Sequence, residues 1–219
     1  MVIAPYGLAA QTFALDSAKG LQPHKVTVET ATYQGRKAVR VMPLPEDDAA
    51  WEASPRGSGG GIVTLPDNTF HNGTIEMEVA GKPRAGAPGA ARGFVGVAFR
   101  LAGDASKYEV FYIRPTNGRA DDQLRRNHST QYFSFPDYEW DRLRKEAPGQ
   151  YESYADLVPG EWTKIKVEVN GVKARLYVNG APQPVLVVND LKLGDGQGGV
   201  ALWVGVGTEA YFTNLRVSE

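Results

Sequence analysis

The chain has 219 residues, of which 24 are Lys or Arg and 25 are Asp or Glu, giving a formal net charge of -1 at pH 7. This balance predicts no nucleic-acid or membrane-surface partner, since both need an excess of basic side chains. The chain contains no cysteine, so disulfides and thiolate metal sites are excluded and the core must be stabilised by packing alone. The length suits one large β-sandwich as well as two small domains.

Targeting signals are weak. No apolar run approaches the roughly 18 residues that a membrane-spanning helix needs, so the sequence predicts a soluble chain without a membrane partner. The opening segment MVIAPYGLAAQTF has small residues before Gln11 that fit the end of a trimmed signal peptide, but it lacks a basic n-region and a full apolar segment. The localisation stays unknown, because a periplasmic or secreted protein fits the sequence as well as a cytoplasmic one.

Alternating apolar and polar residues predict strands along most of the chain. In residues 73–81, Ile75, Met77 and Val79 alternate with polar residues, the period-two pattern of a strand with one buried and one wet face. In chain order, strands are predicted over residues 37–42, 73–81, 93–101, 108–114, 162–171, 174–178, 185–188, 199–205 and 210–217. One short helix is predicted over residues 140–146.

Turn signals separate these strands. Asn170-Gly171 and Asn179-Gly180 are typical of hairpin turns. The glycine-rich stretches 57–61 and 84–93 are predicted to be loops, and neither is long enough to be an interdomain linker. We therefore expect a single domain over residues 1–219.

The order of the strands resembles a known superfamily. The segments GTIEMEV, GFVGVAFR, KYEVFYIRP, GEWTKIKVEVNG, ARLYVNG and VALWVGVGTEAYFTNLRV are similar to those of concanavalin A-like lectins and glucanases. Within that superfamily they are most similar to laminin-G-like jelly rolls and to the bacterial domain associated with 3-keto-disaccharide hydrolysis. The resemblance covers residues 70–219 and implies an all-β jelly-roll sandwich of two antiparallel sheets, with Trp162, Trp203 and Phe212 in the core. It leaves the function open, because this fold carries lectins, hydrolases, lyases and adhesive modules.

The stretch between residues 114 and 144 differs from what a fold alone requires. It holds six arginines, a histidine, an Asp-Asp pair and five aromatic residues, and we expect a functional loop insertion ordered by its aromatic residues. Guanidinium groups donate paired hydrogen bonds to oxygens and aromatic faces stack on sugar rings, so a polyhydroxylated or anionic ligand is favoured. Alternation places Phe133 and Phe135 inward, and Tyr132, Tyr138 and Trp140 outward.

The candidate ligand-binding residues lie on two strands and in this insertion. Alternation along residues 93–101 and 108–114 places Arg100 beside Tyr112 and Arg114, on the concave sheet that the resemblance implies as the binding face. A register shift by one residue would place Glu109 there instead. The set predicted to hold or shape the ligand is Arg100, Tyr112, Arg114, Asn117, Arg119, Arg125, Arg126, Tyr132 and Trp140. Alanine at Arg114 or Arg126 is expected to weaken binding with little loss of stability.

Three residues are candidates for proton transfer. His128 can act as a general base near pH 7, with neighbouring arginines expected to lower its pKa, or it is a loop histidine bonded to the backbone. Glu109 is either tuned by burial or paired with an arginine for structural reasons. Asp122 either orients His128, binds an arginine or contributes to a calcium site. The nearest match to the Glu-x-Asp-x-x-Glu signature of laminarinase-type glucanases ends in Arg144, which argues against retaining hydrolysis by paired carboxylates.

No motif requires a cofactor, since zinc spacing, a P-loop and a dinucleotide fingerprint are all missing from the sequence. A structural calcium ion stays open, because Asp121-Asp122 and the loop at residues 189–196 offer oxygen ligands. Lys192 lies inside that loop, however, and the ligand set is incomplete. No metal-binding residue is therefore assigned.

The sequence predicts a carbohydrate-binding protein, and an enzyme is favoured. The expected chemistry is acid/base cleavage of a glycosidic bond by a hydrolase or, for a uronate or keto-sugar, by a lyase. The alternatives are a non-catalytic lectin-like or laminin-G-like module and an interaction domain whose arginines meet a protein. The ligand and the oligomeric state stay open.

Overall fold

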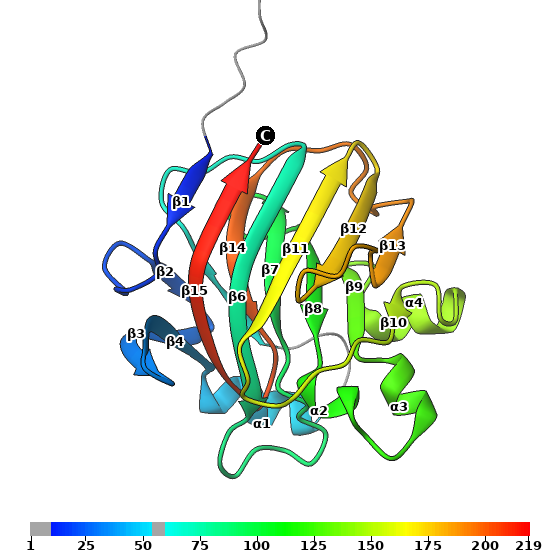
Figure 1. Ribbon diagram of the computed structural model, residues 1–219, viewed down its shortest axis with the longest axis horizontal. Coiled ribbons are helices and arrows are strands. Elements are labelled where there is room, and N and C mark those ends of the chain that lie inside the picture. The colour runs from blue at the N-terminus through cyan, green and yellow to red at the C-terminus, as the bar shows by residue number, and fades with distance from the viewer. Residues whose placement is uncertain (1–9, 54–59) are drawn as a thin grey trace, which may run out of the picture.

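The computed structural model describes residues 10–53 and 60–219. Across these residues the strands form two antiparallel sheets that pack face to face (Figure 1). The expectations about a leader at residues 1–9 and about most of the loop at 57–61 lie outside the described residues. The all-β fold class predicted from the sequence is confirmed.

Sheet A has the strand order β13-β12-β11-β6-β15-β4-β3, with β1 beside β15. Its strands are β1 (Gln11–Phe13), β3 (Val26–Tyr33), β4 (Arg36–Pro43), β6 (Gly73–Pro83), β11 (Thr163–Asn170), β12 (Lys173–Val178), β13 (Leu186–Val188) and β15 (Thr208–Ser218). The first and last strands of the described chain, β1 and β15, are paired in register from Gln11 with Val217. This pairing ties both ends of the described chain to sheet A.

Sheet B has the strand order β10-β9-β8-β7-β14-β5-β2. Its strands are β2 (Gln22–His24), β5 (Gly61–Thr64), β7 (Val95–Leu101), β8 (Tyr108–Ile113), β9 (Thr130–Phe135), β10 (Glu152–Ser153) and β14 (Gly199–Val204). The helices are α1 (Pro45–Ala53), α2 (Pro115–Gly118), α3 (Gln123–Asn127) and α4 (Trp140–Glu146). Helices α3 and α4 lie beside the β9 and β10 edge of this sheet, and α2 lies near the end of β8 (Figure 1).

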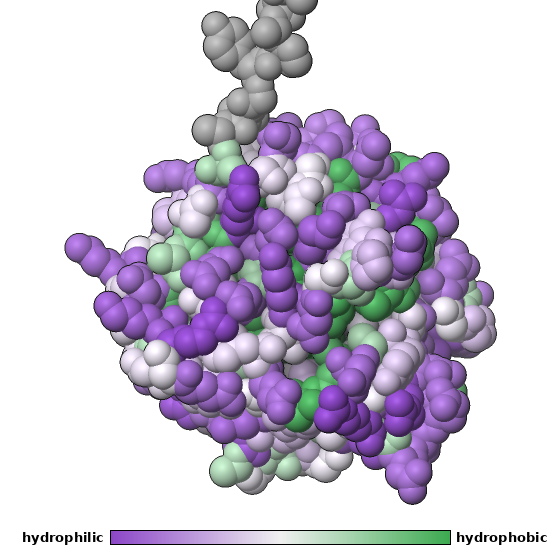
Figure 2. Space-filling model, viewed as in Figure 1, coloured by the Kyte–Doolittle hydropathy of each residue, from purple (hydrophilic) through white to green (hydrophobic). Residues whose placement is uncertain are grey.

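The period-two pattern places side chains as the sequence predicts. Strand β11 pairs Ile165 with Met77 and Val167 with Ile75, and all four side chains are buried between the sheets. The residues between them, such as Lys166, point outward, and Figure 2 shows that the outer face of sheet A is covered mainly by hydrophilic side chains. The predicted hairpin is also confirmed, because β11 and β12 pair up to Asn170 and Lys173.

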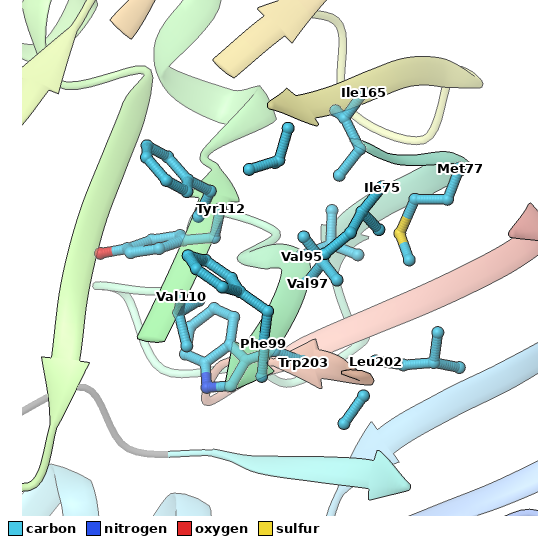
Figure 3. Close-up of a cluster of buried hydrophobic side chains, with 14 of the residues drawn as sticks. Ile75, Met77, Val95, Val97, Phe99, Val110, Tyr112, Ile165, Leu202 and Trp203 are labelled. Carbon is cyan, nitrogen blue, oxygen red and sulfur yellow. The ribbon is translucent and has the colours of Figure 1, made fainter. Parts of the chain in front are cut away.

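The core lies between the two sheets. Figure 3 shows Ile75 and Met77 of β6 and Ile165 of β11 pointing toward the apolar side chains of sheet B. Burying each such side chain contributes about 1.5–3 kcal/mol. Phe212 is buried in this core as predicted, whereas Trp203 is buried on the opposite face of sheet B, contrary to its predicted place in the core.

Trp162 is only half-buried, contrary to its predicted place in the core. It packs edge-on against Tyr33, with ring centroids 5.8 Å apart, in a separate small cluster that includes Tyr211. The tryptophan thus covers a surface cluster.

The predicted loop insertion is partly wrong. Residues 130–135 form β9, which pairs with β8 on one side and with β10 on the other. Alternation along β9 places Tyr132 opposite Phe111 on the core face of sheet B, so it is fully buried and does not point outward as predicted. The predicted helix is confirmed as α4, whereas α1, α2, α3 and the strands β1, β2, β3, β5 and β10 were not predicted.

Unfolding should follow one cooperative transition. Both sheets contribute side chains to the same buried cluster, so neither sheet can lose its partner without exposing that cluster. Far-ultraviolet circular dichroism and tryptophan fluorescence should therefore report the same midpoint on heating. Two separated midpoints would contradict the prediction of a single domain.

Within the described residues, no helix is long and apolar enough to cross a membrane.

Candidate functional site

A cavity of about 270 Å³ lies over the face of sheet B that points away from sheet A. Gly96 of β7 pairs with Tyr112 of β8 and with Trp203 of β14, so these three residues share a face. Their neighbours Val95 and Val97 point to the opposite face, into the core (Figure 3). The floor of the cavity is therefore formed by Tyr112 and Trp203.

Gly96 determines how closely the two floor rings approach. Since it carries no side chain, the rings of Tyr112 and Trp203 lie with centroids 4.7 Å apart across it. A Cβ at this position would clash with the backbone carbonyl oxygen of Phe111 and lie 2.6 Å from the Cα of Tyr112, so an alanine would displace the backbone of β8. Phe94 and Trp140 add two further rings to the lining.

Guanidinium groups form the walls. Arg92 comes from the loop between β6 and β7, Arg114 follows β8, Arg125 lies on α3 and Arg144 lies on α4. Four separate segments of the described chain thus bring an arginine to one small space. Asn117 lines the cavity as well, and its Nδ2 donates to the carbonyl oxygen of His128 at 3.0 Å.

Glu152 connects these groups. The pairing of β10 with β9 places it opposite Gln131, at the edge of sheet B. Its Oε1 accepts from Arg114 Nη1 at 3.1 Å, and its Oε2 accepts from Arg144 Nε at 3.0 Å. His128 Nε2 lies 3.4 Å from Oε2. The carboxylate is thereby shared by two arginines and one histidine.

The pair between Arg114 and Glu152 is almost completely desolvated. The side chains of Arg114 and Glu152 are 7% and 2% exposed. Burial by itself would raise the pKa of Glu152, but the hydrogen bond from Arg144 and the positive charges of Arg114 and Arg144 outweigh it, so the pKa lies below its ordinary value. Arg114 also donates to the hydroxyl of Tyr112 at 2.6 Å and to Gln131. Arg114 is therefore a structural residue of the cavity wall.

His128 lies at the C-terminal cap of α3 and lines the cavity. Burial lowers the pKa of this imidazole, the nearby charges of Arg144 and Arg114 lower it further, and Glu152 opposes them. The predicted direction of the pKa shift is correct. Its main cause is burial, and the arginines that matter are not those next to His128 in the sequence.

Glu109 and Asp122 do not lie with His128. The strand register turns Glu109 to the core face of sheet B, where it is fully buried and accepts from Tyr132 Oη and from the backbone N–H of Leu193 at 2.7 Å. Burial raises the pKa of Glu109, and the hydrogen bond from Tyr132 opposes this. Asp122 is the N-cap of α3 and accepts from the backbone N–H of Arg125 at 2.9 Å. Both residues therefore have structural partners.

Arg100 is not beside Tyr112 and Arg114, contrary to the sequence prediction. Its backbone adopts φ +52°, and the register of β7 with β14 shifts between Gly199 and Ala201. This irregularity breaks the alternation, so Arg100 turns away from the cavity. Its guanidinium donates to backbone carbonyls that include Gly171 at 2.7 Å. The residue holds loops together at the end of the sandwich.

Three further predicted residues also lie outside the cavity. Arg119 forms an exposed pair with Asp156, with Nε 2.7 Å from Oδ1. Arg126 donates to Tyr154 Oη at 3.0 Å on the surface. Tyr132 points into the sandwich, toward Glu109. The expectation that Arg126→Ala weakens binding therefore has no geometric support.

The cavity brings together part of the predicted set and adds residues that the sequence analysis did not select. The predicted residues that line it are Tyr112, Arg114, Asn117, Arg125, His128 and Trp140. Arg92, Phe94 and Arg144, which also line it, and Glu152 beside it were missed, and Trp203 was assigned to the core. Arg144 belongs to the arginine-rich stretch, so composition alone could have included it. Arg92 lies in a glycine-rich loop and Glu152 in a two-residue strand, where no pattern distinguishes them.

The carboxylates proposed for calcium have other partners. Asp190 Oδ2 accepts from Tyr151 Oη at 2.6 Å and from Lys192 Nζ at 2.7 Å. Asp195 Oδ1 lies 2.7 Å from His71 Nε2. The described residues contain no cluster of three or more His, Asp or Glu side chains that could hold a metal ion.

Comparisons of sequence find no relatives: no protein-family model matches the chain, and no curated protein matches it. Solved structures do resemble it. A carbohydrate-binding module from Bacillus subtilis shares 16% identity, covers 90% of this chain and 93% of its own, and gives a TM-score of 0.58. A protein of unknown function with a galectin-like fold, also from Bacillus subtilis, shares 12% identity over 97% of this chain and 95% of its own, with a TM-score of 0.58.

Lectin II from Ulex europaeus gives a TM-score of 0.55 at 8% identity, over 96% of this chain and 97% of its own. At such low identities the similarity establishes the fold alone. Together with the two antiparallel sheets, these matches show that the chain has the jelly-roll fold of the concanavalin A-like and galectin-like proteins.

Proposed function

We propose that the protein binds carbohydrate in the cavity over sheet B. The observation that carries this proposal is that aromatic rings and guanidinium groups meet in one small space. Sugar rings present apolar C–H faces and hydroxyl oxygens, which rings and N–H donors complement. The volume of about 270 Å³ is near the lower end of the roughly 300–1,000 Å³ typical of small-molecule sites. A carbohydrate-binding module and a lectin share the fold, which supports the same ligand class.

Replacing Trp140 tests this proposal. Trp140 lies at the start of α4 and lines the cavity, so Trp140→Ala should weaken binding of a sugar ligand about tenfold, as loss of an aromatic contact predicts. A glycan array would identify a ligand, and isothermal titration calorimetry would compare affinities. Trp162→Ala is the matched control, because Trp162 packs on the outer face of sheet A. Equal affinities of all three proteins would place the site elsewhere.

A second candidate function is acid/base cleavage of the bound sugar, which His128 and Glu152 support. His128 Nε2 faces Glu152 at 3.4 Å, an orienting partner that a catalytic imidazole needs. If Nε2 carries the proton, Nδ1 keeps the lone pair of a general base. For a uronate or keto-sugar, His128 would take the proton beside the carbonyl while arginines stabilise the developing negative charge.

Hydrolysis by two carboxylates has less support, because Glu109 and Asp122 lie outside the cavity. A non-catalytic lectin-like module would bind sugar in the same cavity without turnover. A flat protein-binding interface would not use the cavity, so it has less support. The similarity to laminin-G-like modules and to the domain associated with 3-keto-disaccharide hydrolysis stays a prediction from the sequence.

A further inference from the structure

The cavity over sheet B carries an excess of positive charge. Among the described residues, four arginines line it, whereas the carboxylate paired with them is Glu152. Glu152 is already shared by Arg114, Arg144 and His128. Like charges gathered in one place repel each other, and an anion among them removes that repulsion.

Within residues 10–53 and 60–219, two of the cavity arginines have no acidic partner. Arg92 donates Nη1 to the carbonyls of Gly89 at 2.7 Å and Ala91 at 2.8 Å, which are neutral acceptors. Arg125 has a buried Nε without a hydrogen-bond partner in the described part of the chain. Arg92, Arg114 and Arg125 line the same small cavity, so their like charges disfavour one another. In keeping with this, burial and the charges of Arg125 and Arg114 lower the pKa of Arg92.

The side chain of Asn117, which also lines the cavity, has an unsatisfied hydrogen-bond acceptor. Asn117 Oδ1 is buried without a donor among the described residues, while its Nδ2 is used by the carbonyl of His128. A buried oxygen of this kind can accept from a ligand hydroxyl. The cavity therefore presents free donors for negatively charged oxygens and a free acceptor for an O–H group, beside the aromatic rings.

We propose that the cavity selects an acidic sugar, with its carboxylate held by Arg92 and Arg125 and a ring hydroxyl donating to Asn117. The inference rests on the proposed carbohydrate binding and names the ligand class of that site. A carboxylate fits because its two oxygens match the forked N–H donors of a guanidinium group. Sulfate and phosphate esters share the negative charge but differ in shape, so the experiment includes them.

The test compares sugars that differ in one group. The full chain is titrated with methyl glucoside and methyl glucuronide, with methyl galactoside and methyl galacturonide, and with glucose 6-sulfate and glucose 6-phosphate. Each acidic glycoside should bind at least tenfold more tightly than its neutral partner and than the two esters. Raising the salt concentration should reduce this preference, because the interaction is between charges.

Substitutions then test which arginines hold the carboxylate of the ligand. Arg92→Gln and Arg125→Gln should each weaken binding of the acidic glycoside much more than binding of the neutral one, so that most of the preference is lost. Arg142→Gln should keep the preference, since Arg142 forms an exposed pair with Glu146 on the same α4 helix as Arg144. If Arg92→Gln does not fold, Arg125→Gln carries the test, because Arg125 is a half-buried residue of the short helix α3.

The outcomes separate the two proposals. Equal affinity for neutral and acidic partners, with Trp140→Ala still weakening both, overturns the acidic ligand class and leaves carbohydrate binding intact. Tighter binding of an ester than of either uronide overturns the carboxylate assignment. Binding of none of these sugars, with no ligand on the glycan array, overturns both proposals. An unchanged preference in Arg125→Gln shows that another group holds the anion.

Discussion

Replacing Glu152 by glutamine should lower the free energy of unfolding by about 3–5 kcal/mol, because the substitution leaves a buried guanidinium group without its counter-charge. Arg114 is 7% exposed at its side chain and has Nη1 3.1 Å from Glu152 Oε1. Arg144 and His128 lose the same partner. Urea denaturation followed by circular dichroism at pH 7 would measure the difference.

Glu146→Gln provides the control. Its pair with Arg142 spans one turn of α4, with side chains 43% and 52% exposed. Exposed pairs of this type contribute at most about 0.5 kcal/mol. If Glu152→Gln destabilises the protein no more than Glu146→Gln does, the network around Glu152 has no special role in stability.

The loss of stability caused by Glu152→Gln should become smaller as the pH is lowered. The pKa of Glu152 in the folded protein lies below its ordinary value of 4.5. A group with a lowered folded pKa stabilises the protein above the unfolded pKa and loses that contribution as pH falls through the folded value. The difference in unfolding free energy between the unaltered protein and Glu152→Gln should therefore be constant near pH 7 and shrink below about pH 4.5. A difference that grows on acidification would contradict the assignment.

His128→Ala should reduce turnover by about two to four orders of magnitude if the cavity performs acid/base chemistry, while ligand affinity changes little. The reason is that a general base acts on the proton in the transition state and adds little to ground-state binding. Because the pKa of His128 lies below its ordinary value of 6.5, turnover of the unaltered protein should fall only when the pH drops below that value. Initial rates between pH 4.5 and 8 on uronate, keto-sugar and neutral substrates would show this.

His71→Ala is the matched control for His128→Ala. His71 pairs with Asp195 outside the cavity lining, so its loss should leave turnover unchanged. Full turnover in His128→Ala would eliminate His128 as the base. Binding without turnover on every substrate would support the lectin-like alternative.

The framework of the fold could be predicted because strand alternation is a local property. Residues 73–81 and 162–171 follow period two regularly, so the pattern identifies which side chains face the core. The pairing of β6 with β11 buries the side chains that were predicted. Strand β9 was missed because its sequence TQYFSF carries polar residues on a strand that is buried on both faces. Some of these polar groups bond to partners distant in sequence, as Gln131 Oε1 accepts from Tyr112 Oη, and a local pattern does not reveal such partners.

The candidate site was less accessible to sequence reasoning. Tyr112 and Arg114 came from strand alternation, and Asn117, Arg125, His128 and Trp140 came from the composition of residues 114–144. Arg100 was misplaced because one positive φ angle reverses the direction of its side chain. Glu152 was missed because its importance depends on β10 pairing with β9, a contact of two residues at a sheet edge. Side-chain direction at bulges and the pairing of very short strands both depend on tertiary structure.

The attachment of α4 limits how the protein can be re-engineered. The helix brings Trp140 to the cavity, which makes it an obvious segment to exchange when a different ligand is wanted. It also brings Arg144, whose Nε lies 3.0 Å from Glu152 Oε2. A library that randomises the whole helix would discard this arginine in most clones and lose stability before any gain in specificity could be detected. Libraries that hold Arg144 constant and vary the exposed positions of α4 should therefore yield more folded variants.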